Sequence, residues 1–350
     1  MTRALIAMLA RQPTALRLLM LAVATLAALG LPWVLYPPVA TDVLCWGLFA
    51  VSLDLLLGYT GLLSFGHAAF WGSAAYTTGL IALHLGAPFY LAVLGGAVAA
   101  ALLAAPIGFL AVRRAGMYFA MVTLAFAQMV YFTANQWSSV TGGENGLQAI
   151  PRSLFGVDLS NSLTYYYAAL PVIVLGLFGA WRVVHSPTGR VLLGIRENPD
   201  RVRALGYSTE RFKLLIFVIS AFLAGLAGGL YAINHGFASL QEVHWTTSGK
   251  VTVMTVLGGI GTLWGSLAGA TVIVRLEDWL ATAGFQHVEL ITGAIFILVV
   301  LLFRRGLWGA GARVFRVSRR QTETPAADGN RPHRQDPVPS PPIPPTRHNS

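Results

Sequence analysis

The sequence predicts an all-α integral membrane protein, a polytopic bundle of about eight to ten transmembrane helices that includes broken helices. Of its 350 residues, 55% are hydrophobic and only 11% are charged, and the mean hydropathy is +0.63. Soluble domains carry about a quarter charged residues. Apolar segments of about 20 residues, the length that spans a bilayer, recur along the chain. Together these observations exclude an ordinary soluble enzyme, a disordered scaffold and a secreted disulfide-rich fold.

The apolar segments define a series of candidate membrane spans. They cover residues 15–36, 39–58, 61–86, 88–112, 116–137, 163–185 and 213–235, then an interrupted region 246–280 and a last span 288–303. The first segment follows basic residues, as a signal peptide does. However, Pro32, Trp33 and Tyr36 occupy the place of a small-residue cleavage site, so we expect a retained helix.

The basic residues predict the orientation of these spans, because Arg and Lys concentrate in cytoplasmic loops. With the N-terminus in the cytoplasm, the inside segments hold 14 of the 17 bases in residues 1–310. Arg304 and Arg305 should also be inside, which requires region 246–280 to enter the membrane and return. Its Gly258-Gly259-Ile260-Gly261 centre is the expected turn. Such broken helices occur where they are buried in protein or line a watery cavity. Both termini are then cytoplasmic.

Other function classes find little support. The single cysteine, Cys45, excludes a disulfide framework and a Cys-based zinc site. No Walker motif is present, because Gly249-Lys250 is followed by Val251, and no hydrolase or metalloprotease motif occurs. The net charge of +10 follows the predicted topology, so it does not indicate nucleic-acid binding. If transport here uses ATP, another chain must hydrolyse it.

The transmembrane domain, residues 1–310, is followed by a second unit of different composition. Residues 311–350 hold eight of the 18 prolines and seven arginines, and almost nothing apolar after Val317. This composition predicts a disordered Arg/Pro-rich cytoplasmic tail. It either contacts anionic membrane lipid or is a solvated extension without function.

Small and polar residues inside the spans suggest both packing and function. Stripes such as Gly96-Ala100-Ala104-Gly108 allow close helix packing. The glycine-rich segments 58–61 and 258–261 look alike, as paired broken helices in transporters do, although chance also explains the likeness. His67 is either a satisfied structural donor or a functional group, and Asp54 could pair with it as a proton relay. No metal-ligand spacing surrounds His67.

The charged loop 186–212 predicts a short helix, with Asp200 as its cap and Gly206 as its end. A short helix that mixes acids, bases and apolar residues is suited to docking in the groove of a partner protein. A solvated connector is the alternative.

The chain resembles the LivM-type permeases of high-affinity branched-chain amino acid ABC transporters, from about residue 48 to 309. The resemblance is carried by several ordered motifs. They are LDLLLGYTGLLSFGHAAFWGSAAYT (53–77), MYFAMVTLAFAQMV (117–130), TGGENGL (141–147), the segment 189–232, VLGGIGTLWGSLAGA (256–270) and FRRGLWG (303–309). Leu62 and Asp54 stand where that family usually shows Gln and Asn, which leaves the substrate in doubt more than the fold.

The resemblance implies one half of an ABC importer in a bacterial inner membrane, without a cofactor or metal of its own. A LivH-type second permease, two ATPase subunits that bind ATP and a periplasmic substrate-binding protein would complete it. It also implies roles for three sets of residues. Coupling to the ATPases would use Gly189, Arg196, Glu197, Ala204 and Gly206. The translocation route would be lined or shaped by Gly58, Gly61, Ser64, Gly66, His67, Gly258, Gly259 and Gly261. The outer entrance would contain Gly142, Gly143, Asn145 and Gly146.

Four functions remain in competition. The first is import of leucine, isoleucine and valine, and the second is import of urea or short-chain amides by the same machinery. The third is a secondary transporter or channel that works without ATPases. The fourth is a membrane enzyme, for which the only adjacent acid pair is Glu277-Asp278, and a span end in water explains this pair more simply.

Overall fold

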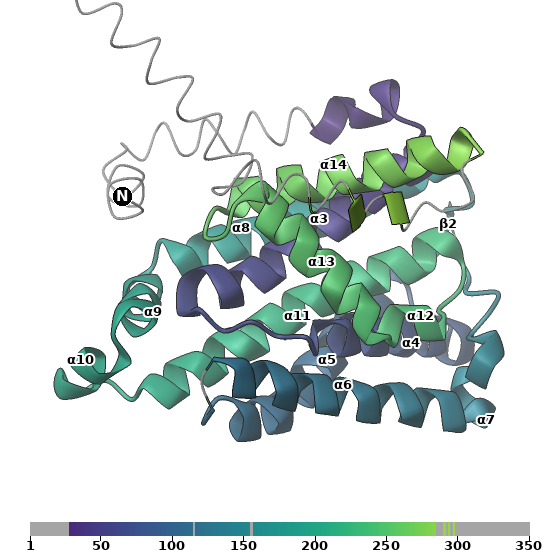
Figure 1. Ribbon diagram of the computed structural model, residues 1–350. Helices are drawn as coiled ribbons and strands as arrows, with labels where there is room; N and C mark the ends of the chain where they lie inside the picture. The colour runs from purple at the N-terminus through teal and green to yellow at the C-terminus, as the bar shows by residue number, and fades with distance from the viewer. Residues whose placement is uncertain are drawn as a thin grey trace, which may run out of the picture. The chain divides into compact units, whose positions relative to one another are not determined.

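The computed structural model describes residues 28–114, 116–154 and 157–284, with a few positions between 290 and 297. Within this part, five helices are long and apolar enough to cross a membrane (Figure 1). They are α3 (Pro37–Thr60), α5 (Phe89–Ala111), α6 (Met117–Gln136), α8 (Ser162–Val184) and α11 (Thr209–His235). Their bounds agree with five of the predicted spans, so the all-α membrane fold is confirmed.

Further elements connect or flank these five helices. The helices are α4 (His67–Leu85), α7 (Ser138–Thr141), the 3₁₀ helix η1 (Gly143–Asn145), α9 (Pro187–Glu197), α10 (Pro199–Ala204), α12 (Leu240–Val243), α13 (Trp245–Gly258) and α14 (Leu263–Thr282). The two-residue strands β1 (Ser153–Leu154) and β2 (Val157–Asp158) form an antiparallel pair. Residues 28–34 are also helical. Most of the predicted spans 15–36 and 288–303, and the whole tail 311–350, lie outside the described residues.

Proline and glycine set the ends of the central helix. Pro37 occupies the first helical position of α3, where a missing N–H costs nothing and the fixed φ suits a helix. At the other end Gly61 has φ 74°, a left-handed conformation that glycine adopts without strain. The 24 residues of α3 extend about 36 Å, enough to cross a bilayer core of about 30 Å.

Helix α3 is the centre of the bundle. In its most apolar part 89% of the residues are buried, compared with 28% in α6 and in α8. It packs against α8, α11 and α14, and α11 packs in turn against α4 and α5. Because α3 is enclosed by other helices, its polar residues can meet protein partners, whereas α6 and α8 present mostly apolar side chains outward.

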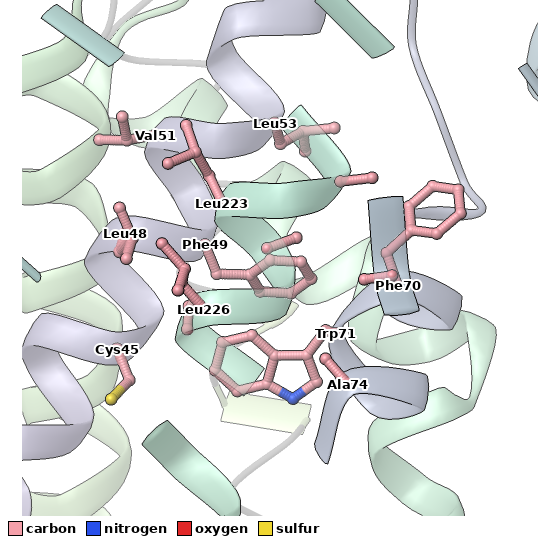
Figure 2. Close-up of a cluster of buried hydrophobic side chains, with 14 of the residues drawn as sticks. Cys45, Leu48, Phe49, Val51, Leu53, Phe70, Trp71, Ala74, Leu223 and Leu226 are labelled. Atoms are coloured by element: carbon pink, nitrogen blue, oxygen red, sulfur yellow. The ribbon is translucent and has the colours of Figure 1, made fainter. Parts of the chain in front are cut away.

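The core where α3, α4 and α11 meet is aromatic (Figure 2). The ring centroid of Trp71 on α4 lies 4.5 Å from Phe49 and 5.2 Å from Trp46, both on α3. Leu223 and Leu226 of α11 complete this cluster. Next to it Gly228 of α11 lies against the backbone of Trp71, where a Cβ atom would collide with the carbonyl group.

The predicted span 61–86 is wrong at its start, because α4 begins only at His67. Gly61 ends α3 in the left-handed conformation, and the chain then turns before the next helix. The Ser64 hydroxyl accepts a hydrogen bond from the Gly66 N–H at 3.3 Å, which stabilises the turn. Gly61 and Ser64 therefore do not share a helix face with Ala68 and Gly72.

Candidate functional site

The predicted interruption between 246 and 280 is a true break between two helices. Helix α13 ends at Gly258, α14 begins at Leu263, and the two are bent by 118°. Gly259 and Gly261 have φ values of 116° and 82°, which other residues rarely adopt. With 14 residues, α13 is about 21 Å long, too short to cross a bilayer core. The predicted turn is confirmed; the side of the membrane on which it lies stays a prediction.

This break lies against the end of α3, so the structure joins the two glycine-rich segments. A Cβ atom on Gly58 would lie 2.7 Å from both the Cα and the N of Gly261. The Asp54 carboxylate accepts a hydrogen bond from the Gly261 N–H at 2.7 Å, and the Tyr59 hydroxyl donates to the Gly261 carbonyl at 3.3 Å. Of the predicted route residues, one site therefore contains Gly58, Gly61, Gly258, Gly259 and Gly261. We call it the α9 end of the bundle, because α9 also reaches it.

The other predicted route residues, near the start of α4, form a second buried group. His67 is fully buried, and its Nε2 lies 3.0 Å from the Ser220 Oγ of α11 and 3.3 Å from the Ser52 Oγ of α3. Ser64 is also buried, and a Cβ on Gly66 would lie 2.6 Å from the Thr123 carbonyl oxygen. His67 therefore binds three helices together.

His67 and Asp54 do not form the proton relay considered from the sequence. Asp54 hydrogen-bonds to the break, while His67 contacts the two serines on α3 and α11. A further partner near His67 escaped sequence reasoning: the Ser248 hydroxyl of α13 accepts the Ala68 N–H at 2.8 Å. This bond satisfies one of the free N–H groups at the start of α4. Nothing in the local sequence around Ser248 signals a partner 180 residues away.

The segment of α9 and α10 carries the predicted coupling residues. Its buried side chains Leu192, Ile195 and Val202 fix it to the bundle. The predicted cap Asp200 is wrong, because the Asn198 side chain caps α10 by accepting the Arg201 N–H at 3.0 Å. Proline follows at position 199, the favoured first helical residue, so the helix starts earlier than predicted. Asp200 instead forms an exposed 3.0 Å ion pair with Arg203.

The individual coupling candidates have different surroundings. Gly206 ends α10 with φ 88°, as predicted. Gly189 is buried against the Val184 carbonyl, where a Cβ would collide. Arg196, Glu197 and Ala204 are exposed, and the Arg196 side chain donates a hydrogen bond to the Gly58 carbonyl. Thus one coupling candidate, Arg196, touches the route candidates directly.

The predicted entrance residues lie in a loop at the opposite end of the bundle. Gly142, Gly143 and Gly146 have positive φ values, and Asn145 is exposed. Leu147 pairs with Ala238 through two backbone hydrogen bonds of 2.8 Å, which ties this loop to the segment after α11. The loop is therefore fixed to the element that leads into the broken helix.

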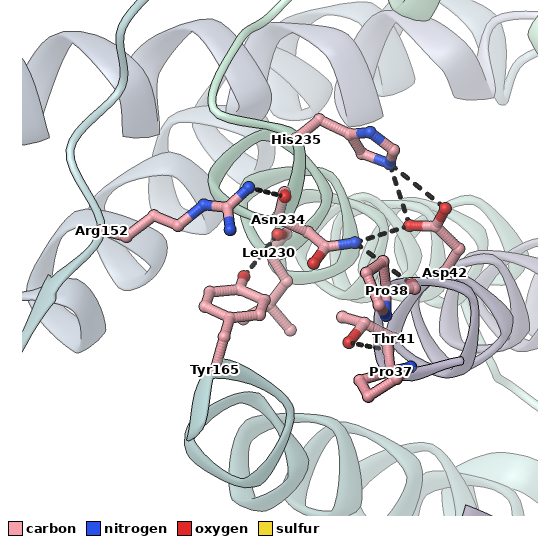
Figure 3. Close-up of polar contacts among 9 residues, drawn as sticks. All are labelled: Pro37, Pro38, Thr41, Asp42, Arg152, Tyr165, Leu230, Asn234 and His235. Carbon is pink, nitrogen blue, oxygen red and sulfur yellow. Dashed lines mark hydrogen bonds and ion pairs between the residues drawn. The ribbon is translucent and has the colours of Figure 1, made fainter. Parts of the chain in front are cut away.

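Near this loop a polar cluster joins α3 to α11 (Figure 3). The Asp42 carboxylate accepts from Asn234 Nδ2 at 2.9 Å and lies 3.0 Å from His235 Nε2. Arg152 donates to the Asn234 carbonyl, and the Tyr165 hydroxyl donates to the Leu230 carbonyl at 2.6 Å. Sequence reasoning did not single out this cluster.

An ion pair links the two arms of the broken region. Lys250 Nζ on α13 lies 2.5 Å from the Glu277 carboxylate on α14, and 4.4 Å from the ring centre of Trp46. Arg275 pairs with Asp278 at 2.8 Å. These pairs explain the acids at 277 and 278 better than exposure to water alone. The sequence contained a signal for the first pair, because Lys250 and Glu277 carry opposite charges on two arms that were predicted to fold back on each other.

Glu242 on α12, outside the spanning helices, is a buried carboxyl whose effect on stability can be measured as a function of pH. Burial raises the pKa of its carboxyl to about 7, against the hydrogen bond that it accepts from the Ser239 N–H at 3.1 Å. A carboxyl whose pKa rises on folding stabilises the fold only while it is protonated. We therefore expect the wild type to lose up to about 3 kcal/mol of stability relative to Glu242→Gln as the pH rises from about 4.5 to 7.

The variant is a matched control, because glutamine also forms this capping arrangement with serine. The measurement is thermal unfolding of both proteins in detergent from pH 4.5 to 8. If the unfolding midpoints of the two proteins changed in parallel with pH, the expectation would be wrong.

In the described residues no group of three or more His, Cys, Asp or Glu side chains could hold a metal ion.

A family model described as the permease component of the branched-chain amino acid transport system matches residues 37–301. The chain belongs to this family. The permease is 31% identical to the high-affinity branched-chain amino acid transport system permease protein LivM of Salmonella typhimurium, over 77% of this chain and 69% of that protein.

Two further relatives extend this comparison. LivM of Escherichia coli K12 is 30% identical to the permease over the same shares of the two chains. The high-affinity branched-chain amino acid transport system permease protein LivH of that strain is 25% identical to the permease over 75% of this chain and 91% of its own. No solved structure matches the permease.

Family membership settles the class of protein. The permease is a multi-pass membrane transport component, and its family is not an enzyme family. The names of these relatives favour branched-chain amino acids over urea or short-chain amides.

Proposed function

We propose that the permease is one half of an ABC importer that moves leucine, isoleucine and valine across a bacterial inner membrane. The observation that carries this proposal is the α9–α10 segment. It is fixed to the bundle by buried side chains, yet Leu205 and Tyr207 beside it are 72% and 46% exposed. Exposed apolar side chains on a short, charged helical segment suit docking into a partner protein. The relatives named LivM and LivH support a transport system with two permease proteins.

In this proposal the partners divide the work. A LivH-type permease completes the route, two ATPase subunits bind and hydrolyse ATP, and a periplasmic binding protein delivers the substrate. The α9 end faces the cytoplasm together with both termini, as the distribution of Arg and Lys predicts. The loop 142–146 faces the binding protein, and membrane lipid covers the apolar sides of α6 and α8.

The route follows the α9 end of the bundle and the neighbouring buried group around His67. Gly58, Gly61 and Gly258–Gly261 shape its cytoplasmic side, and Ser64, Gly66 and His67 hold the start of α4 beside it. Gly189, Arg196, Glu197, Ala204 and Gly206 receive the motion of the ATPases. Alternating access then follows as the packed helices rock around this route.

The experiment is reconstitution of the permease with its partner permease, ATPases and binding protein in liposomes. We expect ATP-dependent uptake of labelled leucine, isoleucine and valine, and none of labelled urea or acetamide. Uptake of urea would favour the second substrate class. Leucine uptake by the permease without ATPases would instead show a stand-alone transporter.

Gly206→Val should separate transport from assembly. A β-branched residue at φ 88° costs about 1–2 kcal/mol and distorts the end of α10. We expect uptake to fall roughly tenfold, since this cost is near 1.4 kcal/mol, while the amount of inserted permease is unchanged. Gly206→Asn is the matched control, because asparagine tolerates the left-handed conformation, and it should retain most of the uptake. Normal uptake by the valine variant would remove Gly206 from the coupling segment.

A further inference from the structure

The α9 end contains a polar chain of contacts that joins three separate elements. The Arg196 guanidinium of α9 donates to the Gly58 carbonyl in the last turn of α3. The last carbonyl groups of a helix lack partners within it, and they carry the negative end of the helix dipole. Arg196 therefore supplies both a donor and a compensating charge to the end of α3.

The same guanidinium also lies beside the break. A Cβ atom on Gly261 would be 3.4 Å from Arg196 Nη1, and one on Gly61 would be 3.4 Å from Arg196 Cγ. The positive charge of Arg196 also acts on the carboxyl of Asp54. Asp54 is fully buried and holds the break through the Gly261 N–H. Arg196 thus contacts the end of α3 and the break at once, from a helix that is not part of either.

The break is the part of this site that can change conformation. Its Gly259 and Gly261 have φ values of 116° and 82°, and glycine can move between such conformations and ordinary ones at little cost. The contacts of Asp54 and Tyr59 fix Gly261 in its observed position. Displacing α9 would withdraw the donor from Gly58 and the charge from Asp54.

We infer that Arg196 is a positioning residue that transmits the displacement of α9 to the break between α13 and α14, and so controls the cytoplasmic side of the route. This inference rests on the proposed function, because it takes the ATPases as the source of the displacement. It goes beyond that proposal by naming the contact through which the motion reaches the route. In the observed state, the hydrogen bond to the Gly58 carbonyl fixes Arg196 to the end of α3, beside the break.

The test measures how many substrate molecules are taken up for each ATP hydrolysed by the reconstituted transporter. A hydrogen bond to a charged group contributes about 1.5–3 kcal/mol, so Arg196→Gln should lower this ratio by roughly tenfold or more. ATP hydrolysis itself should continue, because the variant removes the link and not the ATPases. A merely structural role would lower uptake and assembly together and would leave the ratio unchanged.

Arg190→Gln provides the matched control. Arg190 lies on α9, is exposed like Arg196 and would lose the same charge, but it makes no hydrogen bond or ion pair with other described residues. We expect its ratio to equal that of the wild type. A double variant, Arg196→Gln with Asp54→Asn, should have a ratio no lower than Arg196→Gln alone, since residues of one contact chain are not additive.

The outcomes are distinct. An unchanged ratio in Arg196→Gln, or an equal fall in Arg190→Gln, would overturn the inference. If the wild type takes up substrate without hydrolysing ATP, the proposed function fails instead. If Arg196→Gln does not assemble, Arg196→Lys carries the test: it keeps the charge but loses the planar fork of donors. Its ratio should fall by about threefold, and a wild-type ratio would overturn the inference.

Discussion

Replacing Gly228 with alanine should destabilise the permease strongly. Alanine in a helix interior normally stabilises by up to about 1 kcal/mol relative to glycine. Here the added Cβ collides with the Trp71 carbonyl and lies 2.9 Å from its carbon, so the α4 and α11 backbones must separate. Overpacking of this kind costs about 1–3 kcal/mol, and we expect a thermal midpoint in detergent lower by roughly 5 °C or more.

Gly179→Ala is the control for this prediction. Gly179 also lies within a helix, α8, but an added Cβ there meets nothing within 4 Å. We expect this variant to be as stable as the wild type or slightly more stable. Equal midpoints for the two variants would show that the close approach of α11 to Trp71 can relax without cost.

Gly58→Ala should strongly reduce uptake while leaving insertion intact. The added Cβ would lie 2.7 Å from the backbone of Gly261 and 2.5 Å from an oxygen of Asp54, so it would push the break away from α3. The break would then lose its hydrogen bonds to Asp54 and Tyr59. Losing one hydrogen bond costs about 1.4 kcal/mol, which corresponds to a factor of ten. We therefore expect uptake in the reconstituted transporter to fall by about tenfold or more.

Gly249→Ala in α13 is the matched variant, because a Cβ at Gly249 meets nothing within 4 Å. It should transport normally. If Gly58→Ala also transported normally, contact between the end of α3 and the break would not be needed for transport.

The sequence was sufficient for the long apolar elements, because membrane-spanning length and composition leave few alternatives. It also located the break at Gly258–Gly261, since the orientation of the basic residues required that region to reverse. The start of α4 could not be located in this way. Residues 61–66 are apolar and small enough for a helix, and only the left-handed Gly61 and the Ser64 contact show where α3 ends and α4 begins.

The site could be predicted only in part, because its contacts join residues far apart in the chain. Glycines 58 and 261 were candidates, yet their contact depends on how α14 packs on α3. Arg196 was a candidate for partner binding, and its reach to the Gly58 carbonyl follows from the position of α9, which no local pattern fixes. The hydrogen bonds of His67 to Ser52 and Ser220 likewise need three helices in place.

The central position of α3 has a consequence for biosynthesis. Asp54 is made 207 residues before Gly261, which supplies its hydrogen bond. At about 5–20 residues per second, a ribosome needs roughly 10–40 s to make the intervening chain. During that time α3 of the incomplete chain holds a polar side chain without its final partner, next to lipid or to the membrane insertion machinery. Chains that stop before α14 should therefore be the ones that cellular proteases remove first.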